Sequence, residues 1–265
     1  MHTIFTTNGM KKKSHLKNST NGYKAACAIQ NVKQTEKRKV YHNMSFTHRK
    51  VILHLCADTG SDTRYYDESD EYDVELVGER VGVENFSVTR WLHMHPQYTG
   101  IHGIIANPVC LEFSTARHGG KARNPEDGMF LVKECQRIIE EAKSYGELKF
   151  WVIENPAKGV LKNYLGKPKF QYEPWWFGSP WTKKTALWGE FNIPERKYTD
   201  WADVPKLDGL YTRPTRPKPS LAFMHKNHIR FIPEFIEAGF QPDSDMEFRS
   251  LCSQKFAKAF FEVNR

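Results

Sequence analysis

The sequence predicts an α/β fold built on a mainly parallel sheet with helices on both faces. Three short apolar runs, residues 51–56, 101–106 and 150–153, have the length and composition of buried strands, and each ends at polar, turn-forming residues. An amphipathic helical pattern lies between the second and third runs. Strands that alternate with polar loops and helices are typical of parallel sheets, whose crossover connections cover both faces. With 265 residues and 39% hydrophobic residues, the chain can fill such a core.

The loop after the first predicted strand is the candidate cofactor site. Residues 57–62 read ADTGSD, a turn-rich segment with two aspartates. Acidic side chains disfavour a pyrophosphate, which binds bare backbone amides, and suit a ligand that carries a cation, such as a sulfonium. A further predicted strand, 74–77, ends just before Glu79, and an acidic residue after the second strand is the usual partner of ribose hydroxyls. Glu84 is the other candidate for this role.

A cysteine follows the apolar run at 101–106. Cys110 lies in the segment NPVCLEFSTAR, just beyond that run, so it is expected at the carboxyl end of a central strand. Ligands bind at that edge of open α/β sheets, and a thiol there can be presented to a substrate. The alternative is a structural thiol, because free cysteine is among the most buried residue types. Its neighbours Glu112, Ser114 and Arg117 are unusual company for a core thiol.

The clearest helix signal follows. Asn124 is a favourable N-cap, Pro125 suits the first helical position, and acidic residues in the first turn complement the helix dipole. One apolar stripe runs along the predicted helix: Leu131, Cys135, Ile138, Ile139 and Ala142. Cys135 is therefore expected in the core.

The apolar run at 150–153 ends in Glu154. A carboxyl group at the end of a buried strand is partly desolvated, and desolvation raises its pKa toward neutrality. Glu154 is thus a candidate acid or hydrogen-bond donor.

Two later segments suit nucleic acid. Aromatic residues and lysines interleave between 170 and 188, as in surfaces that stack on bases, although aromatic clusters more often pack together. Residues 192–233 are predicted to be irregular, and the acid-free part at 209–233 carries five Lys and Arg, which makes it a candidate DNA-contacting region. Ser253 is expected to cap a final helix whose apolar side holds Phe256, Phe260 and Val263.

The charge pattern divides the chain into a leader and a domain. The net charge is +8, yet residues 1–50 carry eleven Lys and Arg against one Glu, and the remainder has a balance of −2. Residues 1–48 are also rich in polar residues without apolar periodicity, so we expect a basic, disordered leader and a single domain at 49–265.

Composition excludes several other classes. The sequence contains neither a signal peptide nor an apolar run long enough to span a membrane, so a cytoplasmic location is expected. Five scattered cysteines, without a CxxC pair, suggest neither a disulfide framework nor a metal site. We expect reduced thiols, no metal and no membrane partner, and a monomer.

Four motifs in this order resemble the DNA cytosine-5 methyltransferases, closest to the compact phage-type branch. They are PVCLEFSTAR, ENP, FGSPWTKKTALWG and FAKAFFEVN, and the resemblance covers residues 51–265. It implies a Rossmann-like fold that binds S-adenosyl-L-methionine and methylates carbon 5 of cytosine in DNA through a covalent cysteine adduct at carbon 6. Two departures stand out: Val109 replaces the proline that precedes the cysteine in the family, and the long target-recognition region of larger members is missing.

The resemblance also implies roles for individual residues. Cys110 corresponds to the nucleophile, Glu154 to the carboxyl group that hydrogen-bonds the cytosine ring, and Lys184 to a basic group that supports the site. The residues implied at the cofactor pocket are Cys56, Ala57, Asp58, Thr59, Gly60, Glu79, Asn107 and Pro108, and those implied to contact the substrate are Ser114, Arg117, Lys183 and Thr185.

Other functions compete with this interpretation. Asn107-Pro108 also suits an altered NPPY-type loop, which would make the protein an amino-methyltransferase acting on adenine or cytosine nitrogen, although Glu154 and the missing aromatic residue favour the cytosine-5 assignment. A noncatalytic nucleic-acid-binding relative is the second alternative, because the cofactor loop keeps only Gly60 of the usual glycines. RNA is not excluded as a substrate.

Overall fold

The computed structural model describes residues 49–57, 59–78, 81–114, 124–210, 212 and 215–265. The basic leader that the sequence predicts to be disordered lies outside these residues, as do Asp58, Glu79 and Arg117.

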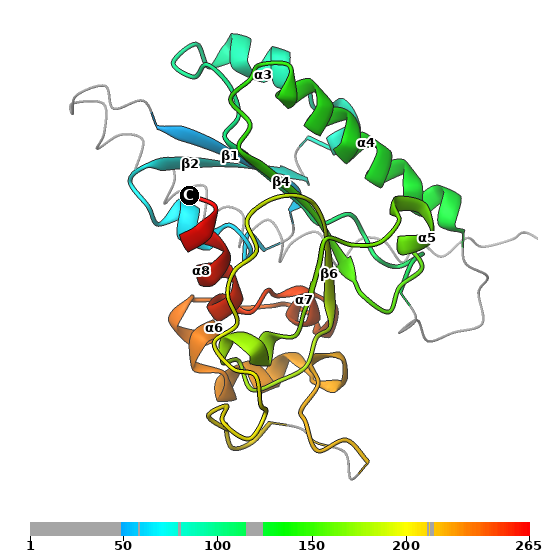
Figure 1. Ribbon diagram of the computed structural model, residues 1–265, viewed down its shortest axis with the longest axis vertical. Helices are drawn as coiled ribbons and strands as arrows, with labels where there is room; N and C mark the ends of the chain where they lie inside the picture. The colour runs from blue at the N-terminus through cyan, green and yellow to red at the C-terminus, as the bar shows by residue number, and fades with distance from the viewer. Residues whose placement is uncertain (1–48, 58, 79–80, 115–123, 211, 213–214) are drawn as a thin grey trace, which may run out of the picture. The chain divides into compact units, whose positions relative to one another are not determined.

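A six-stranded sheet with strand order β2-β1-β3-β4-β6-β5 forms the centre of the fold (Figure 1). Its parallel part contains β1 (Lys50–Ala57), β2 (Tyr72–Gly78), β3 (Gly103–Ala106) and β4 (Phe150–Pro156). β6 (Thr185–Glu190) pairs antiparallel with both β4 and β5 (Phe170–Tyr172), so β6 is the reversed strand of this sheet. The sheet is mainly parallel, as the apolar runs predicted.

One face of the sheet packs against α3 (Val88–Met94) and α4 (Pro125–Lys143). The strand side chains alternate, so Leu53 and Leu55 point to this face, where Cys135 and Ile138 of α4 are fully buried. Burying each side chain of this size contributes roughly 1.5–3 kcal/mol. The helix begins where the sequence predicted, but Asn124 does not cap it with its side chain, which instead donates to the carboxylate of Asp127.

The opposite face packs against α2 (Arg64–Asp67) and α8 (Gln254–Val263). Phe256 and Phe260 of α8 lie against the strand residues of this face, and the ring of Phe256 stacks on Tyr172 at a centroid distance of 3.7 Å. Ser253 caps the helix as predicted, because its hydroxyl accepts from the backbone N–H of Phe256. Figure 1 shows α3 and α4 on one side of the sheet and α8 on the other, so helices cover both faces.

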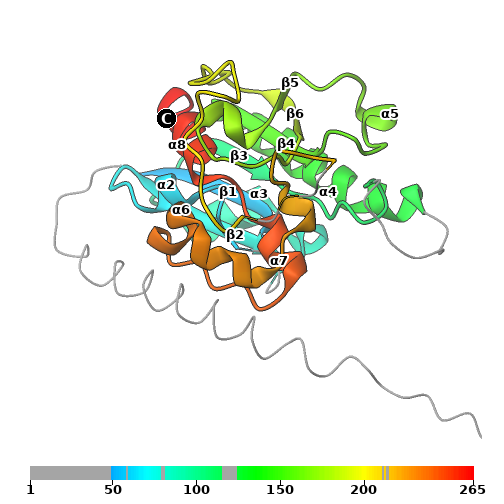
Figure 2. The ribbon, with the colours of Figure 1, turned by 90° about the horizontal axis from the view of Figure 1, so that it is seen from below.

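Short helices connect these elements, and those after residue 220 build a second, smaller core. They are η2 (Val83–Asn85), α5 (Lys162–Leu165), η3 (Pro174–Phe177), η4 (Leu221–Phe223), η5 (Lys226–Phe231), α6 (Pro233–Glu237) and α7 (Asp245–Ser250). The smaller core contains Trp181, Met224, Phe235 and Phe248. Figure 2 shows α6 and α7 in one group of short helices. Among the described residues of 191–220 there is neither a helix nor a strand.

The parallel strands, the helices on both faces and the reversed strand β6 together form a Rossmann-like methyltransferase fold. In this arrangement β1, β3 and β4 are adjacent and parallel, so their carboxyl ends meet at the same edge. That edge carries most of the residues that the sequence predicted to be functional.

Candidate active site

A chain of hydrogen bonds links the carboxyl ends of β1, β3 and β4. The imidazole Nε2 of His54 lies 2.9 Å from Oδ1 of Asn107, and Nδ2 of Asn107 donates to Oε2 of Glu154 over 3.4 Å. The amide nitrogen of Asn107 faces a carboxylate, so its oxygen faces the imidazole and Nε2 is the protonated atom of that pair. On the other side of the ring, Nδ1 of His54 lies 3.1 Å from the hydroxyl of Thr63. The chain therefore fixes the carboxyl group of Glu154 relative to the loop that follows β3.

Burial raises the pKa of Glu154 to about 7. The nearby charge of Lys183 and the hydrogen bond from Asn107 oppose this shift, whereas the negative charge of Asp62 adds to it. At neutral pH this carboxyl group is divided between its neutral and charged forms, so it can both donate and accept a proton. The sequence predicted the direction of this pKa shift from the position of Glu154 at the end of a buried strand.

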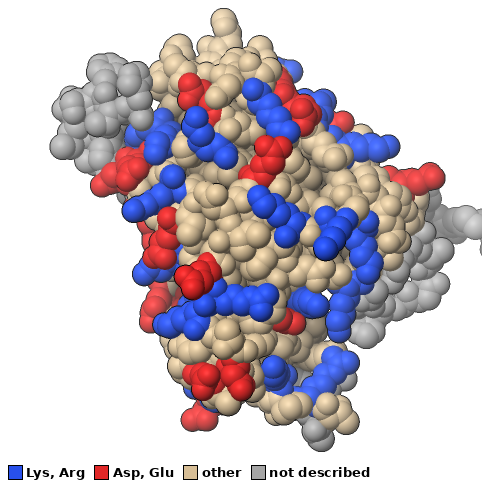
Figure 3. All heavy atoms as spheres, in the orientation of Figure 1, with Lys and Arg blue, Asp and Glu red and all other residues tan. Residues whose placement is uncertain are grey.

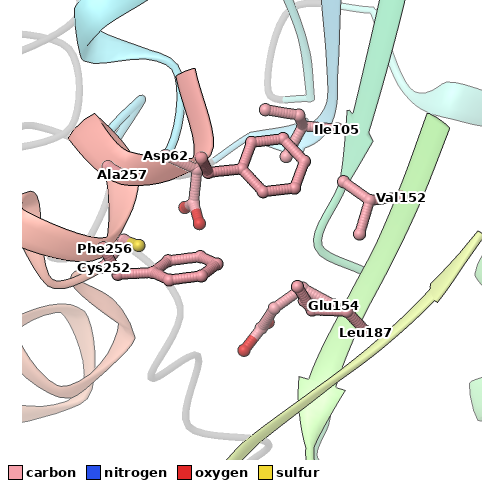
Figure 4. Close-up of a pocket in the computed structure, with 9 residues that line it drawn as sticks. Asp62, Ile105, Val152, Glu154, Leu187, Cys252, Phe256 and Ala257 are labelled. Carbon is pink, nitrogen blue, oxygen red and sulfur yellow. The ribbon is translucent and has the colours of Figure 1, made fainter. Parts of the chain in front are cut away.

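The carboxyl group of Glu154 lines a small pocket on the α8 side of the sheet. Figure 4 shows Asp62 and Cys252 on one side of the pocket and Val152, Glu154 and Leu187 on the opposite side. Phe256, Phe260, Ala257 and Ile105 complete the lining. About 20 Å³ is available to the centres of water-sized spheres, which is enough for about one water molecule. The aromatic side chains of α8 thus keep Glu154 in a nearly dry environment.

Cys252 shares this pocket but is held in its neutral form. Burial raises the pKa of its thiol well above the ordinary value, and the charge of Asp62 raises it further. The phenol oxygen of Tyr172 lies 3.9 Å from the sulfur, and burial likewise raises the pKa of Tyr172. Cys252 is a thiol rather than a thiolate at neutral pH, so it is a poor nucleophile despite its position beside two carboxyl groups.

The loop that carries Cys110 is anchored on both sides. Before the cysteine, Nδ2 of Asn155 donates to the carbonyl oxygen of Pro108 over 3.0 Å. After it, the backbone N–H of Val160 donates to the carbonyl oxygen of Phe113. Phe113 itself is completely buried. Both anchors come from β4 or the turn that follows it, so the loop is fixed to the strand that carries Glu154.

Between these anchors the loop reaches the surface. Val109 and Leu111 are 49% and 53% exposed, whereas Cys110 between them is half-buried. The backbone N–H groups of Phe113 and Ser114 both donate to the carbonyl oxygen of Cys110, which forms a tight turn. The thiol therefore lies in an accessible turn at the sheet edge rather than in the core.

Two of the predicted cofactor residues, Cys56 and Ala57, lie where β1 and β2 end together. Ala57 pairs with Gly78, and a Cβ at Gly78 would come within 2.8 Å of the carbonyl oxygen of Ala57, so only glycine allows this approach. Cys56 has a φ of 54°, an unfavourable conformation for a residue other than glycine, and a register shift between β1 and β2 occurs at the same point. Its sulfur lies 3.8 Å from that of Cys135, on the α4 face, so the Cys56 side chain points away from the pocket.

The next part of this loop is tied to the end of the chain. Gly60 has a φ of 66°, and the hydroxyl of Ser61 accepts from the backbone N–H of Cys252. The side chain of Gln254 donates to the carbonyl oxygen of Ser61 over 3.0 Å. Asp62 consequently faces Glu154 across the pocket.

The predicted basic residues lie at the start of β6. Lys183 faces inward: its Nζ donates to the carbonyl oxygens of Ser250 and Leu251, and its positive charge acts on Glu154. Lys184 is exposed, and its carbonyl oxygen accepts from the backbone N–H of Ala157. Thr185 is buried and donates to the carbonyl oxygen of Lys183, which is a structural contact.

Sequence reasoning did not assign roles to three residues of this site. His54 interrupts an apolar strand and is 2% exposed in the structure. The interruption is visible in the sequence, and a polar residue inside such a run needs a buried partner. Asp62 was recognised as part of an acidic loop but not as the neighbour of Glu154. Cys252 is far from both in the sequence, and no local pattern marks it.

Comparisons with known proteins add a structural similarity. Neither a protein-family model nor a curated protein sequence matches the chain. Among solved structures, the chain is similar to a crystal structure from E. coli described as a "putative DNA modification methyltransferase" encoded within a prophage, with 14% sequence identity and a TM-score of 0.40. The match covers 59% of this chain and 51% of that one, so this chain spans about half of that structure's length.

The described residues contain no group of three or more His, Cys, Asp and Glu side chains arranged to hold a metal ion. In the same part of the chain, no helix has the length and apolar character needed to cross a membrane.

Proposed function

We propose that this protein transfers a methyl group from S-adenosyl-L-methionine to carbon 5 of cytosine in DNA, with Cys110 as the nucleophile and Glu154 as the acid. The observation that carries the proposal is the carboxyl group of Glu154, whose pKa of about 7 is matched to proton transfer at neutral pH. Asn107 connects that carboxyl group to the start of the Cys110 loop. A nucleophile and an acid anchored to one another suit addition to a ring that must gain a proton as the new bond forms.

The chemistry explains why both groups are needed. Carbon 5 of cytosine is a weak nucleophile, and addition of a thiolate to carbon 6 moves an electron pair through the ring toward carbon 5 and nitrogen 3. Glu154 in its neutral form donates a proton to nitrogen 3, so charge does not accumulate there. Once carbon 5 carries the methyl group, a base removes the proton of carbon 5. The electron pair restores the double bond between carbons 5 and 6 as the bond between carbon 6 and sulfur breaks, and nitrogen 3 returns its proton to Glu154. Cys110 is then free for another turnover.

The described residues fit a sulfonium cofactor at the ends of β1 and β2. The close pairing of Ala57 with Gly78 brings the ends of both strands together, and Asp62 would place a negative charge near a cationic ligand. S-adenosyl-L-methionine supplies the electrophilic methyl group when bound. Thr59 and Gly60 belong to the same loop, whereas Asp58 and Glu79, the expected partners of the remaining polar groups, lie outside the described residues. Asn107, which the resemblance assigns to this pocket, contacts His54 and Glu154.

Nucleoside analysis tests the proposal directly. The protein is incubated with S-adenosyl-L-methionine carrying a labelled methyl group and with single-stranded and double-stranded DNA, and the DNA is digested to nucleosides. We expect labelled 5-methylcytosine. Labelled N4-methylcytosine or N6-methyladenine would show an amino-methyltransferase, and binding of DNA without any methylation would show a noncatalytic relative.

A trapping experiment tests the covalent step. Fluorine at carbon 5 of cytosine cannot leave as a cation, so an oligonucleotide with 5-fluorocytosine should retain the enzyme as an adduct. We expect a protein–DNA band that survives denaturing electrophoresis with the wild type and with Cys252→Ser, but not with Cys110→Ser. Mapping of the adduct to a residue other than Cys110 would overturn the proposed nucleophile.

A further inference from the structure

Three segments of the chain meet beside the carboxyl end of β4 and place lysines and tryptophans on one surface. We call this surface the Trp–Lys patch, and it consists of Lys158, Trp175, Lys184, Trp201 and Lys218. Two of its lysines, Lys158 and Lys184, are exposed, and the remaining members are half-buried.

Backbone contacts position the lysines. The N–H of Ala157 donates to the carbonyl oxygen of Lys184, which brings the turn after β4, with Lys158, next to the segment that leads into β6. The N–H of Thr182 donates to the carbonyl oxygen of Pro219 over 2.8 Å, and an isolated β-bridge pairs Thr182 with Ser220. Lys218 therefore lies beside the same segment.

Glu173 lies among these lysines. Its carboxylate accepts from the backbone N–H of Lys183 over 3.0 Å. Burial raises the pKa of Glu173, while the charges of Lys184, Lys158 and Lys218 oppose this shift, consistent with three cations around one partly buried carboxyl group. One carboxylate does not neutralise three ammonium groups, so the charge around Glu173 is net positive. In Figure 3, Lys and Arg side chains gather near the part of the molecule where Figure 1 places β6.

The tryptophans add flat apolar surface to this charge. Nζ of Lys218 lies 4.4 Å from the ring centroid of Trp175 and 5.3 Å from that of Trp201, and the two indoles meet edge to face at 6.1 Å. The exposed acidic residues Asp200 and Asp203 flank Trp201 in the sequence and bound the patch on that side. Aromatic rings beside lysines bind unpaired bases by stacking and phosphates by charge.

The shape of this region favours an unpaired strand over a duplex groove. The major groove admits an α-helix or a two-stranded ribbon, and proteins that read it commonly insert one of these. The described residues of 191–232 contain neither, since they form only η4 and η5, which are three and six residues long. A base that stacks on an indole must first leave its duplex. A cytosine that reaches a buried carboxyl group must do the same.

We infer that the Trp–Lys patch binds single-stranded DNA next to the target cytosine, with an unpaired base stacked on Trp175 and phosphates against its lysines. The inference rests on the proposed function, because it identifies the surface that binds the DNA strand whose cytosine reaches Glu154. It specifies that the preferred substrate is an unpaired or locally opened strand and that binding depends little on sequence.

Fluorescence anisotropy with labelled oligonucleotides tests the inference. The full chain should bind single-stranded DNA more tightly than a duplex of the same sequence. Trp175→Ala should weaken single-strand binding by about tenfold or more, while Trp175→Phe, which keeps a stacking ring, should retain most of the affinity. Lys133→Ala, which removes an exposed lysine from α4, is the matched control and should change little.

The salt dependence of binding provides a second readout. For single strands, each lost phosphate contact should reduce the slope of log K against log salt by about 0.7, so Lys158→Gln and Lys218→Gln should each have this effect. These exposed or half-exposed substitutions also test the patch if Trp175→Ala fails to fold. Equal affinity for duplex and single strand, or an unchanged slope in both lysine variants, would overturn the inference.

The two proposals fail in different ways. If labelled 5-methylcytosine forms but Trp175→Ala and the lysine variants bind DNA like the wild type, the patch is wrong and the methyltransferase function stands. If those variants lose single-strand binding but no methylated nucleoside forms, the surface stands and the methyltransferase function is wrong.

Discussion

Cys110 and Cys252 lie at the same edge of the sheet but in opposite environments. Cys110 is in an accessible turn after β3, between two exposed apolar side chains. Cys252 is 4% exposed and lines the pocket that holds Asp62 and Glu154, where burial and negative charge raise the pKa of its thiol. A search for the thiol closest to the acid would select Cys252. In the proposed mechanism the nucleophile must be accessible and must form a thiolate, and the pocket of Cys252 disfavours both.

Glu154 contacts both the pocket of Cys252 and the start of the Cys110 loop. Its carboxyl group lines the dry pocket of Cys252, which raises its pKa, and it also accepts from Asn107, which begins the loop of Cys110. The pocket raises the proton affinity of Glu154, and the hydrogen bond from Asn107 holds its carboxyl group next to the start of the Cys110 loop.

The largest expected effect separates the two cysteines. Cys110→Ser should lose methylation by several orders of magnitude, because a serine hydroxyl supplies almost no anion at neutral pH. Cys252→Ser should keep activity within a few-fold of the wild type. Initial rates with labelled cofactor measure both variants. Comparable losses in the two variants would show that the buried thiol takes part in the reaction.

Replacement of the shared acid should have the next largest effect. Glu154→Gln keeps a hydrogen-bond donor for the cytosine ring but removes proton transfer, so we expect methylation to fall about 10²–10³-fold with little change in DNA affinity. Steady-state kinetics and anisotropy on the same preparation measure the two quantities. A loss of affinity equal to the loss of rate would indicate a binding role instead.

Glu154 should also make stability depend on pH. Its pKa is about 7 in the folded protein and about 4.5 in the unfolded chain, so between these values the folded state binds more protons. The contribution is therefore complete below about pH 4.5 and is lost as the pH rises to about 7, an upper limit of about 3 kcal/mol in the free energy of unfolding. Urea denaturation across this range should show the decline in the wild type, and Glu154→Gln should reduce it.

Asp62→Asn should make the environment of Cys252 more similar to that of Cys110. The charge of Asp62 raises the pKa of both Glu154 and Cys252, so its removal should lower both. We expect the pH optimum of methylation to move to lower pH and Cys252 to react faster with iodoacetamide. Asp208→Asn, an exposed change in the irregular segment, is the matched control. Slower alkylation of Cys252 in Asp62→Asn would contradict the electrostatic explanation.

Replacement of a third cysteine, Cys135, should have the smallest effect on methylation. Cys135 is completely buried on α4, and its sulfur lies 3.8 Å from that of Cys56. Cys135→Ser places a hydroxyl in this core, so unfolding should cost about 1–3 kcal/mol less while methylation is unchanged. Cys135→Ala separates the effect of polarity from that of lost volume. Thermal denaturation and the nucleoside assay together distinguish this structural thiol from Cys110.

The parts of the fold that the sequence predicted are those with local signals. Each apolar run became a strand, α4 begins at the predicted proline, and Ser253 caps α8, because side-chain periodicity and helix capping depend on residues close in the chain. The raised pKa of Glu154 was predictable for a related reason, since the end of a buried strand is desolvated wherever the strand packs.

The remaining features depend on contacts between distant residues. Asp62 and Cys252 line the same side of the pocket. One comes from the loop after β1 and the other from the segment before α8, and no pattern in either segment indicates that the two are in contact. The three-residue strand β5 is too short to give a pattern. The place of His54 in the hydrogen-bond chain also needed the structure, although a histidine within an aliphatic run was a visible sign of a buried polar contact.

The ties between Ser61 and the segment before α8 have a consequence for biosynthesis. The hydrogen bonds from Cys252 and Gln254 to Ser61 join residues 191 and 193 positions apart, and Tyr66 donates to the carbonyl oxygen of Asn264 across 198 positions. A chain still emerging from the ribosome can form β1, β2 and α4 but not the finished loop after β1. Contacts of such long sequence separation form late and slowly. Nascent chains that stop before residue 252 should therefore contain a sheet in which the loop after β1 lacks these ties, and that loop reaches its final structure only as the last helix docks.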